Sequence, residues 1–352
     1  MIGTPEYELA KYLDTFIKAN IPSNFMLNST AMFLQKLKSF IFNVDDILIS
    51  FDVVSLYTNI PLQETIDLVT KYVYGENSKC KPPFSNIIFK KLLTKATGGL
   101  FMYRDKLFRQ IDGVTMGSPL GPSLANLFMA HLENKYMALN SVRTNPRLYL
   151  RYIDDIFCVF SKNVDFKSFL NILNSQHKNL KFTYEEGNQC IPFLDTKITL
   201  NNGNFESLVY RKATNTDVLL NFEALCPINW KIGLVKGVFH RAWNICSSYV
   251  NFNIEIEKLF VIFMKNGYPK NLLHSILKKF LYSKFETCDS KDISDFKFWI
   301  KIPYVGKPSL KFKNDIVKLF KTNLSIDISC VFVSFKFGNY YSLKYSNNII
   351  HN

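Results

Sequence analysis

The chain has 352 residues, of which 47% are hydrophobic and 20% charged, proportions of a globular protein with a sizeable core that exclude an intrinsically disordered chain. Lys and Arg outnumber Asp and Glu by 43 to 29, and most of this excess falls after residue 160, which favours a polyanionic partner over a general need for solubility. The seven cysteines form no Cys-x-x-Cys pair, so neither a disulfide framework nor a zinc knuckle is expected.

The first 42 residues predict two helices. From Pro5 onward, leucine or isoleucine recurs every four residues as far as Ile17, which is typical of an amphipathic helix. The break at Ile21-Pro22-Ser23 ends that helix, and a second helix is predicted over residues 30–42. Its apolar face is expected to comprise Phe33, Leu34, Leu37, Phe40 and Ile41.

Asp52 stands where an apolar run ends, since residues 46–51 have the composition of a strand. A single carboxylate at a strand end is weak evidence for a site. Pro61 is expected to open the next helix, because proline is favoured at the first helical position. Residues 80–88 predict a loop, and residues 101–111 predict a hairpin.

Three glycines shape the segment that follows this hairpin. Gly113, Gly117 and Gly121 let the backbone approach a ligand closely. The segment lacks the Gly-Lys-Ser/Thr ending of a P-loop, so ATP hydrolysis is not expected. Residues 123–131 then predict an apolar helix.

Asp154 and Asp155 separate two apolar, aromatic-rich runs within residues 148–160. Two such runs joined by a short polar step predict a β-hairpin that presents both carboxylates at its tip. Adjacent anions repel, Arg151 supplies one positive charge only, and hard divalent cations prefer carboxylate oxygens. An acidic turn in an ordinary β-protein is the alternative for any isolated Asp-Asp. Combined with Asp52, the pair favours two metal ions about 4 Å apart, the arrangement that supports phosphoryl transfer.

The next elements are expected to complete a sheet. Residues 164–176 predict a helix, residues 180–185 and 191–200 predict strands, and Asn201–Asn204 predicts a hairpin turn. Two strand–helix–strand passes with carboxylates at strand ends would make a ferredoxin-like sheet. Asp195 is assigned a structural role, because two metal ions need no carboxylate beyond three.

From residue 228 the composition changes to long helices. Three are predicted, over residues 230–248, 254–265 and 271–282. Gly267 ends one helix and Pro269 opens the next, so the last two form a helix–turn–helix. Lys278, Lys279 and Lys284 lie on or just after its second helix. They are expected either to form a solvated face or to contact duplex phosphate.

Shorter elements surround these helices. Residues 206–212 predict a strand that ends in the cationic pair Arg211-Lys212. Beyond residue 288, the predicted elements are a strand at 300–305, a basic helix at 309–322 and strands at 327–336 and 340–346. The sequence shows no secretory leader and no apolar run of membrane-spanning length, which predicts an intracellular, nuclear protein without a membrane partner.

Three of these motifs resemble those of reverse transcriptases. Tyr152-Ile-Asp-Asp155 has the Tyr-x-Asp-Asp signature, residues 51–61 resemble the preceding metal-binding motif, and residues 113–126 resemble the segment between the two. The amino-acid sequences of these motifs, and of Ile191–Asp195 and Val209–Lys212 after them, are similar to those of Penelope-like retroelements. The resemblance runs through nearly the whole chain in the family's order.

The resemblance implies an α+β right-hand polymerase fold with a ferredoxin-like palm. Residues 1–42 are expected to be a partial fingers region, residues 43–205 the palm, residues 206–290 a helical thumb with a helix–turn–helix, and residues 291–352 a basic C-terminal segment. The family's basic fingers motifs would precede this region and are missing. A GIY-YIG endonuclease is not expected either, because Tyr304-Val-Gly306 is not its motif.

The implied activity is that of an RNA-directed DNA polymerase, in which a primer 3′-hydroxyl attacks the α-phosphate of an incoming deoxynucleoside triphosphate. Asp52, Asp154 and Asp155 would hold two Mg²⁺ ions, with Mn²⁺ as a substitute. The implied partners are an RNA template, a DNA primer and deoxynucleoside triphosphates, and protein partners are left open.

Further roles come from the same resemblance. Tyr57 would lie under the sugar and exclude a 2′-hydroxyl, with a buried core tyrosine as the alternative. Met116 and Gly117 would contact the nucleotide. Met116 stands where many reverse transcriptases have glutamine, so the hydrogen bond of an amide is not expected there. Contacts to primer and duplex phosphates are assigned to cationic residues: Arg211, Lys212, Lys278 and Lys279.

Two other interpretations stay open. Because the fingers motifs that hold the triphosphate are missing, the chain is expected to bind nucleic acid without efficient synthesis. The alternative to a reverse transcriptase is a truncated, catalytically inactive copy of the element that only binds nucleic acid. A structural protein whose acidic turn and basic helices are unrelated is less favoured, because five motifs keep the order of the family.

Overall fold

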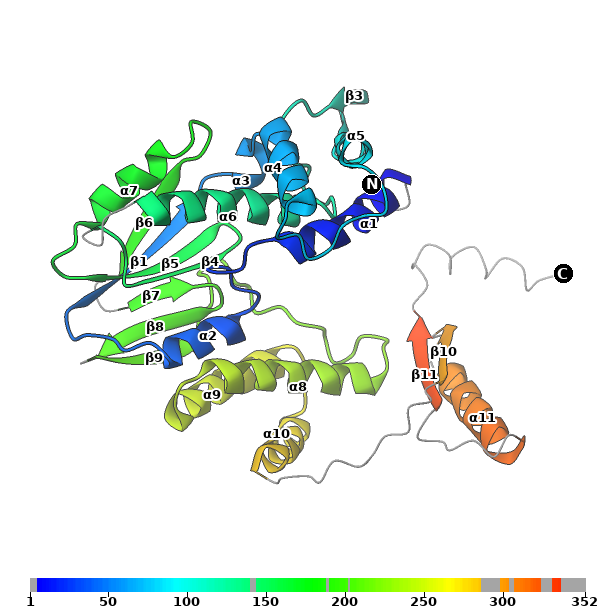
Figure 1. Cartoon of the computed structure of the whole chain (residues 1–352). Coiled ribbons are helices and arrows are strands. Elements are labelled where there is room, and N and C mark those ends of the chain that lie inside the picture. The colour runs from blue at the N-terminus through cyan, green and yellow to red at the C-terminus, as the bar shows by residue number, and fades with distance from the viewer. Residues whose placement is uncertain are drawn as a thin grey trace. The chain divides into compact units, whose positions relative to one another are not determined.

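The computed structural model describes these stretches of the chain: residues 5–139, 144–187, 190–201, 203–285, 298–303, 307–323 and 331–336. They belong to two compact units (Figure 1). The first unit is Met1–Ala213 with Asn244–Asn251, and the second is Thr214–Trp243 with Phe252–Asn352.

A four-stranded antiparallel sheet forms the centre of the first unit. Its strands are β1 (Asp46–Val53), β4 (Leu148–Tyr152), β5 (Asp155–Ser161) and β6 (Phe182–Gly187). They lie in the order β4-β5-β1-β6, so the two central strands are the third and the first of the four along the chain. This is the order of a ferredoxin-like sheet, and the two predicted strand–helix–strand passes produce it.

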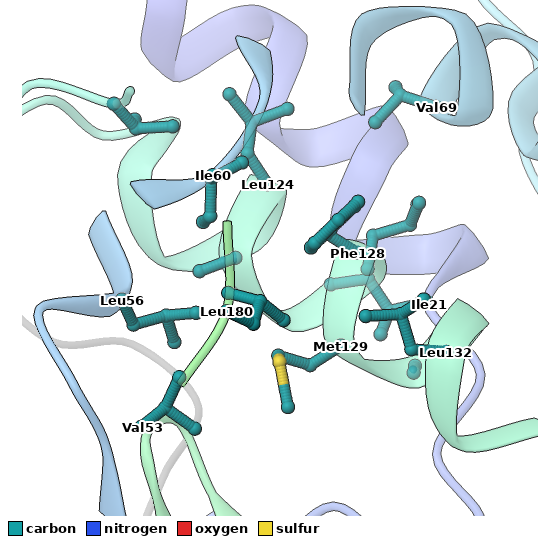
Figure 2. Close-up of a cluster of buried hydrophobic side chains, with 14 of the residues drawn as sticks. Ile21, Val53, Leu56, Ile60, Val69, Leu124, Phe128, Met129, Leu132 and Leu180 are labelled. Carbon is teal, nitrogen blue, oxygen red and sulfur yellow. The ribbon is translucent and has the colours of Figure 1, made fainter. Parts of the chain in front are cut away.

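Side chains alternate between the two faces of this sheet, because successive residues of a strand point to opposite sides. On one face, Phe51 and Phe160 belong to a core that is completed by helices. The helices are α1 (Pro5–Asn20), α3 (Leu56–Asn59), α4 (Leu62–Tyr74), α5 (Asn86–Ala96), α6 (Gly121–Leu139) and α7 (Phe166–Ser175). Both α6 and α7 run along the sheet (Figure 1). Figure 2 shows Phe128 of α6 in one cluster with Val53 of β1 and Val69 of α4.

The opposite face of the sheet packs on a second core. Leu48 and Phe157 lie there with side chains of α2 and of a three-stranded antiparallel sheet. These elements are α2 (Thr30–Lys38), β7 (Cys190–Phe193), β8 (Thr196–Asn201) and β9 (Asn204–Val209). The Phe33 ring of α2 lies 5.0 Å from the Phe157 ring and 4.7 Å from the Phe193 ring. The aromatic contacts therefore join the two sheets through α2.

The helix predicted over residues 30–42 is shorter than expected. It ends at Lys38 and leaves Ile41 81% exposed, so the prediction that Ile41 belongs to its apolar face is wrong. The Ile41 carbonyl oxygen accepts a hydrogen bond from the Arg147 guanidinium at 2.9 Å. The Ile41 carbonyl therefore bonds to Arg147, which is distant in the sequence, and not to the backbone amide that a longer helix would offer.

Two other predictions in this unit need correction. Residues 86–88, predicted as loop, open the unpredicted helix α5, where the Ser85 hydroxyl accepts a hydrogen bond from the Ile88 amide. The strand predicted over residues 191–200 is interrupted at Leu194, whose φ of 55° lies in the turn between β7 and β8.

The predicted hairpins and several helices are confirmed. β2 (Leu100–Tyr103) pairs with β3 (Lys106–Arg109), and β8 pairs with β9 next to the predicted turn. The helix expected to open at Pro61 is α4, which has Pro61 as its N-cap. The helix expected over residues 164–176 is α7.

The second unit contains the predicted helix–turn–helix. Apart from the connection at residues 244–251, it holds α8 (Ile228–Ile245), α9 (Tyr249–Lys265) and α10 (Lys270–Phe285). Gly267, at a φ of 82°, follows α9, and Pro269 immediately precedes α10. The Phe239 ring of α8 lies 6.2 Å from the Phe260 ring of α9 and 6.3 Å from the Phe280 ring of α10.

Further elements of this unit follow the three helices. They are β10 (Phe298–Pro303), α11 (Lys307–Asn323) and β11 (Val331–Lys336), and β10 pairs with β11 in parallel. The predicted strand at residues 340–346 and the Tyr304-Val-Gly306 stretch lie outside the described residues. Every helix in the described part of the chain is too short or too polar to span a membrane.

Candidate active site

The hairpin of β4 and β5 carries the acidic pair at its turn. Tyr152 of β4 is paired with Asp155 of β5, so Ile153 and Asp154 form the turn between them. Ile153 has a φ of 57°, a left-handed conformation that costs a β-branched residue about 1–3 kcal/mol. The surrounding structure therefore has to hold this turn in place.

Strand pairing brings Asp52 to the turn. Asp52 lies opposite Asp155 where β1 pairs with β5. The Val53 amide donates a hydrogen bond to the Asp154 carbonyl oxygen at 3.2 Å. The structure thus gathers Asp52, Asp154 and Asp155 at one end of the sheet, from motifs far apart in the sequence.

Burial and charge repulsion raise the pKa values within this group. The pKa of Asp155 is raised to about 6, first by burial and then by Asp154 and Asp52, while Lys212 opposes the rise. The pKa of Asp52 is also raised, by burial and then by Asp154 and Glu185. A bound cation would favour the ionised form of each carboxyl and relieve the repulsion.

A cavity of about 320 Å³ lies beside these carboxylates, and its lining includes Asp52, Asp155, Glu185 and Lys212. Glu185 was not predicted as a site residue. β6 pairs it with Ser50 of β1, which places it on the same strand face as Asp52. The alternation along β6 is the signal that could have found Glu185, once the pairing of β6 with β1 is known.

The donor set fits a hard divalent cation, because every acidic side chain at the turn offers oxygen. Within the described stretches, no three His, Cys, Asp or Glu side chains converge closely enough to form a metal-ligand group. The carboxylates are gathered at the turn without closing into a coordination shell, as expected for like charges that repel one another.

The three residues predicted to contact the nucleotide line a second cavity. Tyr57, Met116 and Gly117 surround a space of about 420 Å³ together with Lys11 and Lys18 of α1. The two lysines were not predicted as site residues. The four-residue apolar repeat predicts α1 itself, but it carries no information about what the polar face of the helix meets.

Tyr57 connects this second cavity to the acidic turn. Its pKa is raised by burial and then by Asp154 and Tyr152, so its hydroxyl lies within reach of the carboxylate charge. The Tyr57 carbonyl oxygen accepts a hydrogen bond from the Val114 amide at 2.7 Å, which ties the glycine segment to the Asp52 motif. Tyr57 is partly buried against the core and also lines the cavity, a position that fits either of the two predicted roles.

Glycine is required where this segment approaches the Asp52 motif. Gly113 has a φ of 76°, and an added Cβ would lie 2.7 Å from the Thr58 carbonyl oxygen. Gly117 has a φ of 89° but open space around it. Gly113 is therefore fixed by conformation and by contact, and Gly117 by conformation alone.

Two known families match the chain. The family described as reverse transcriptase (RNA-dependent DNA polymerase) matches residues 10–186, half of the chain, with all three carboxylates inside the match. The chain belongs to the reverse transcriptase family. The animal helix-turn-helix domain matches residues 218–278, the region of α8 to α10. With the sheet order described above, these matches confirm the predicted fold class, a right-hand polymerase with a ferredoxin-like palm and a helical region with a helix–turn–helix.

Solved polymerases are similar to this reverse transcriptase at low identity. The telomerase from Candida albicans in complex with the TWJ fragment of telomeric RNA has 13% identity and a TM-score of 0.49, over 80% of this chain and 50% of that chain. The corresponding Candida tropicalis complex has 13% identity and a TM-score of 0.44, over 98% and 49%. The RNA-dependent RNA polymerase 3Dpol of a sicinivirus has 12% identity and a TM-score of 0.41, over 79% and 55%.

This reverse transcriptase spans about half the length of the telomerases it matches. No curated protein sequence matches it.

The cationic residues predicted to contact nucleic acid lie in both units of the reverse transcriptase. Lys212 lines the carboxylate cavity, and Arg211 before it is partly buried. Lys278 and Lys279 are exposed on α10, and the Lys278 ammonium lies 5.8 Å from the centre of the Tyr282 ring. Of the four, the structure brings Lys212 together with the carboxylates.

Arg151 does not supply the local positive charge that the sequence suggested. Its side chain is fully buried, and its guanidinium pairs with Glu133 of α6. Lys212 is the cation that lowers the pKa of Asp155. The acidic turn therefore has less compensating charge than its sequence indicates.

Proposed function

We propose that this reverse transcriptase extends a DNA primer along an RNA template, and that Asp52, Asp154 and Asp155 hold two Mg²⁺ ions, or Mn²⁺ in their place. The observation that supports the proposal most is the register of β1 and β5, which sets Asp52 opposite Asp155. When bound, two such ions activate the primer 3′-hydroxyl and stabilise the leaving phosphate oxygen.

The carboxylates serve as oxygen ligands in their ionised form. Because the pKa of Asp155 is about 6, this side chain is mostly ionised at pH 7.5 and mostly protonated at pH 5 in the absence of a cation. Protons and metal ions therefore compete for the site, and the metal requirement is expected to rise as the pH falls.

The neighbouring cavity is proposed as the site of the incoming deoxynucleoside triphosphate. Tyr57 would contact the sugar and discriminate against a 2′-hydroxyl, and Met116 and Gly117, which line the same cavity, would also contact the nucleotide. Lys11 and Lys18 also line this cavity, together with Asp14, whose carboxylate pairs with the Lys18 ammonium at 2.6 Å. Lys11 would bind the phosphates as a point charge, and Lys18 would do so in competition with Asp14.

The nucleic acid would be held through its phosphates. Arg211 and Lys212 are assigned to the primer strand beside the carboxylates, and Lys278 and Lys279 to the duplex. Contacts of this kind fix position and carry no base information. The helix–turn–helix is therefore proposed to bind the duplex backbone without reading its sequence.

The finer assignments belong to the same proposal. The amino-acid sequences of the motifs support a Penelope-like retroelement as the subtype, and a nuclear location stays a prediction. The partition into fingers at residues 1–42, palm at 43–205, thumb at 206–290 and a basic C-terminal segment at 291–352 also stays a prediction.

Nucleic-acid binding without synthesis is the second candidate function. The basic composition, with a net charge of +14, supports binding whether or not catalysis occurs.

A primer-extension assay on poly(rA)–oligo(dT) separates the two functions. Wild type and the control Asp105→Asn, which removes an exposed carboxylate from the turn of β2 and β3, are expected to extend the primer inefficiently and at the same rate. Asp154→Asn is expected to bind the duplex equally well and to extend it at least about 100-fold more slowly, because a metal ligand is lost. Equal duplex binding by all three proteins with no extension by any of them would establish the binding function instead.

A further inference from the structure

Arg151 is buried completely and is bound to the turn that carries the acidic pair. Its exposed fraction is 0%, which is rare for an arginine. The guanidinium donates to both carboxylate oxygens of Glu133, at 2.5 and 3.2 Å, and to the Asn126 side-chain oxygen at 2.8 Å. It also donates to the Ile153 carbonyl oxygen at 3.0 Å. That oxygen belongs to the residue held at a φ of 57°, immediately before Asp154.

The backbone of Arg151 is fixed as firmly as its side chain. The Arg151 amide donates to the Phe25 carbonyl oxygen at 2.8 Å, and the Leu27 amide donates to the Arg151 carbonyl oxygen at 2.7 Å. The Glu133 carboxylate accepts a further hydrogen bond from the Tyr149 hydroxyl at 3.0 Å. The guanidinium therefore presents a rigid donor to the turn.

A purely structural role accounts poorly for this arrangement. Replacing a buried ion pair by apolar residues of similar volume is often neutral or stabilising, so stability alone gives little reason to bury Arg151 and Glu133. The donor to Ile153 serves a different purpose, because it holds a conformation that a β-branched residue does not adopt by itself.

The partners of Arg151 also connect the two cavities. Asn126 and Glu133 are seven residues apart on α6 and so share one face of the helix. α6 begins at Gly121, the end of the glycine segment that lines the nucleotide cavity. Arg151 thus joins the helix that follows the nucleotide segment to the turn that carries the carboxylates.

We infer that Arg151 is a positioning residue, which holds the Ile153 carbonyl and thereby fixes the turn that presents the two carboxylates to the metal ions. The inference rests on the proposed function, because it concerns the same metal site. Loss of this hydrogen bond lets Ile153 relax toward the extended region and spreads the carboxylates over several arrangements.

The test replaces the buried pair as a unit, since Arg151→Met alone would leave the Glu133 carboxylate buried and unpaired. Arg151→Met/Glu133→Met is compared with the control Arg147→Met/Asp46→Asn. The control removes the ion pair between Asp46, the first residue of β1, and Arg147, which immediately precedes β4. It therefore changes the end of the sheet away from the turn.

Two measurements on the whole chain are made, neither of which depends on polymerase activity. Calorimetric titration with Mn²⁺ is expected to show about 10–100-fold weaker binding by Arg151→Met/Glu133→Met, the loss typical of residues that orient metal ligands. Hydrogen–deuterium exchange is expected to accelerate in the peptide that spans residues 152–156. The control pair is expected to keep the wild-type values of both.

Equal Mn²⁺ affinity and equal exchange in the two double variants would overturn the inference and leave the proposed function standing. Absence of Mn²⁺ binding by wild type would overturn both. If the double variant does not fold, Asn126→Leu decides the question, because it removes a partner of the guanidinium without stranding a charge. A smaller loss of Mn²⁺ affinity and a smaller acceleration of exchange in Asn126→Leu support the inference. Wild-type affinity and exchange in that variant refute it.

Discussion

Replacing Asp155 by Asn is expected to stabilise the metal-free protein while it abolishes metal binding. The pKa of Asp155 is about 6 in the folded chain, against an ordinary value of 3.8, because burial and two neighbouring carboxylates disfavour the ionised form. The folded state therefore holds this proton more tightly than the unfolded state does. The stability that the protonated group contributes is complete below about pH 4 and is lost as the pH rises through 6.

The size of the effect follows from the shift. Roughly two pKa units correspond to about 3 kcal/mol in the free energy of unfolding. Asp155 is only partly buried, so solvent screening reduces this figure, and about 1–2 kcal/mol is expected at pH 7.5. For a chain of 352 residues, with an unfolding entropy of about 2.1 cal/mol/K per residue, Asp155→Asn should melt about 1–3 °C above wild type at that pH.

Thermal unfolding in EDTA between pH 4 and pH 8 measures this advantage, with the exposed Asp105→Asn as the control for removal of one charge. The advantage of Asp155→Asn should be absent near pH 4 and complete above about pH 7. Excess Mg²⁺ should raise the melting temperature of wild type by mass action and leave that of Asp155→Asn unchanged. An advantage that is the same at both ends of the pH range, or that Asp105→Asn also shows, would refute the reasoning.

Three further outcomes are expected. Lys212→Met should move the acid limb of the pH–activity profile to higher pH, because Lys212 lowers the pKa of Asp155; an unmoved limb contradicts this. Lys278→Ala/Lys279→Ala should weaken duplex binding and reduce the slope of log affinity against log salt by up to about 2, whereas an unchanged slope argues against phosphate contacts on α10. Tyr57→Val should increase ribonucleotide incorporation relative to deoxyribonucleotide while Tyr57→Phe does not, and equal discrimination by both variants would assign Tyr57 to the core alone.

Local elements could be predicted where one periodicity or one residue type decides. The two apolar runs on either side of Asp154-Asp155 predict the hairpin, and Gly267 with Pro269 predicts the turn between α9 and α10. Prediction fails where a distant side chain intervenes. The second helix ends early although its apolar pattern continues to Ile41, whose carbonyl is bound by Arg147.

The geometry of the site depends on information that no local pattern contains. Asp52 meets Asp155 only because β1 and β5 pair in one register, which the burial of both faces of these strands enforces. Glu185 joins the cavity through a third strand. The sequence places Arg151 three residues before Asp154 and suggests a counter-charge, while the fold turns its guanidinium to Glu133 on α6.

The acidic turn destabilises the folded protein, and burial of apolar side chains elsewhere in β1 and β5 outweighs this destabilisation. Phe51 and Ile156 are fully buried on one face of the sheet, and Leu48 and Phe157 are buried on the other. Burial of one such side chain contributes about 1.5–3 kcal/mol, so two of them exceed the destabilisation by Asp155 derived above. The sheet is therefore expected to fold with its carboxylates uncompensated, and a chelator should lower the melting temperature without removing the secondary structure. Far-UV circular dichroism at 25 °C in EDTA checks this, and loss of the folded spectrum there would show that the ions, and not the two cores, hold the sheet together.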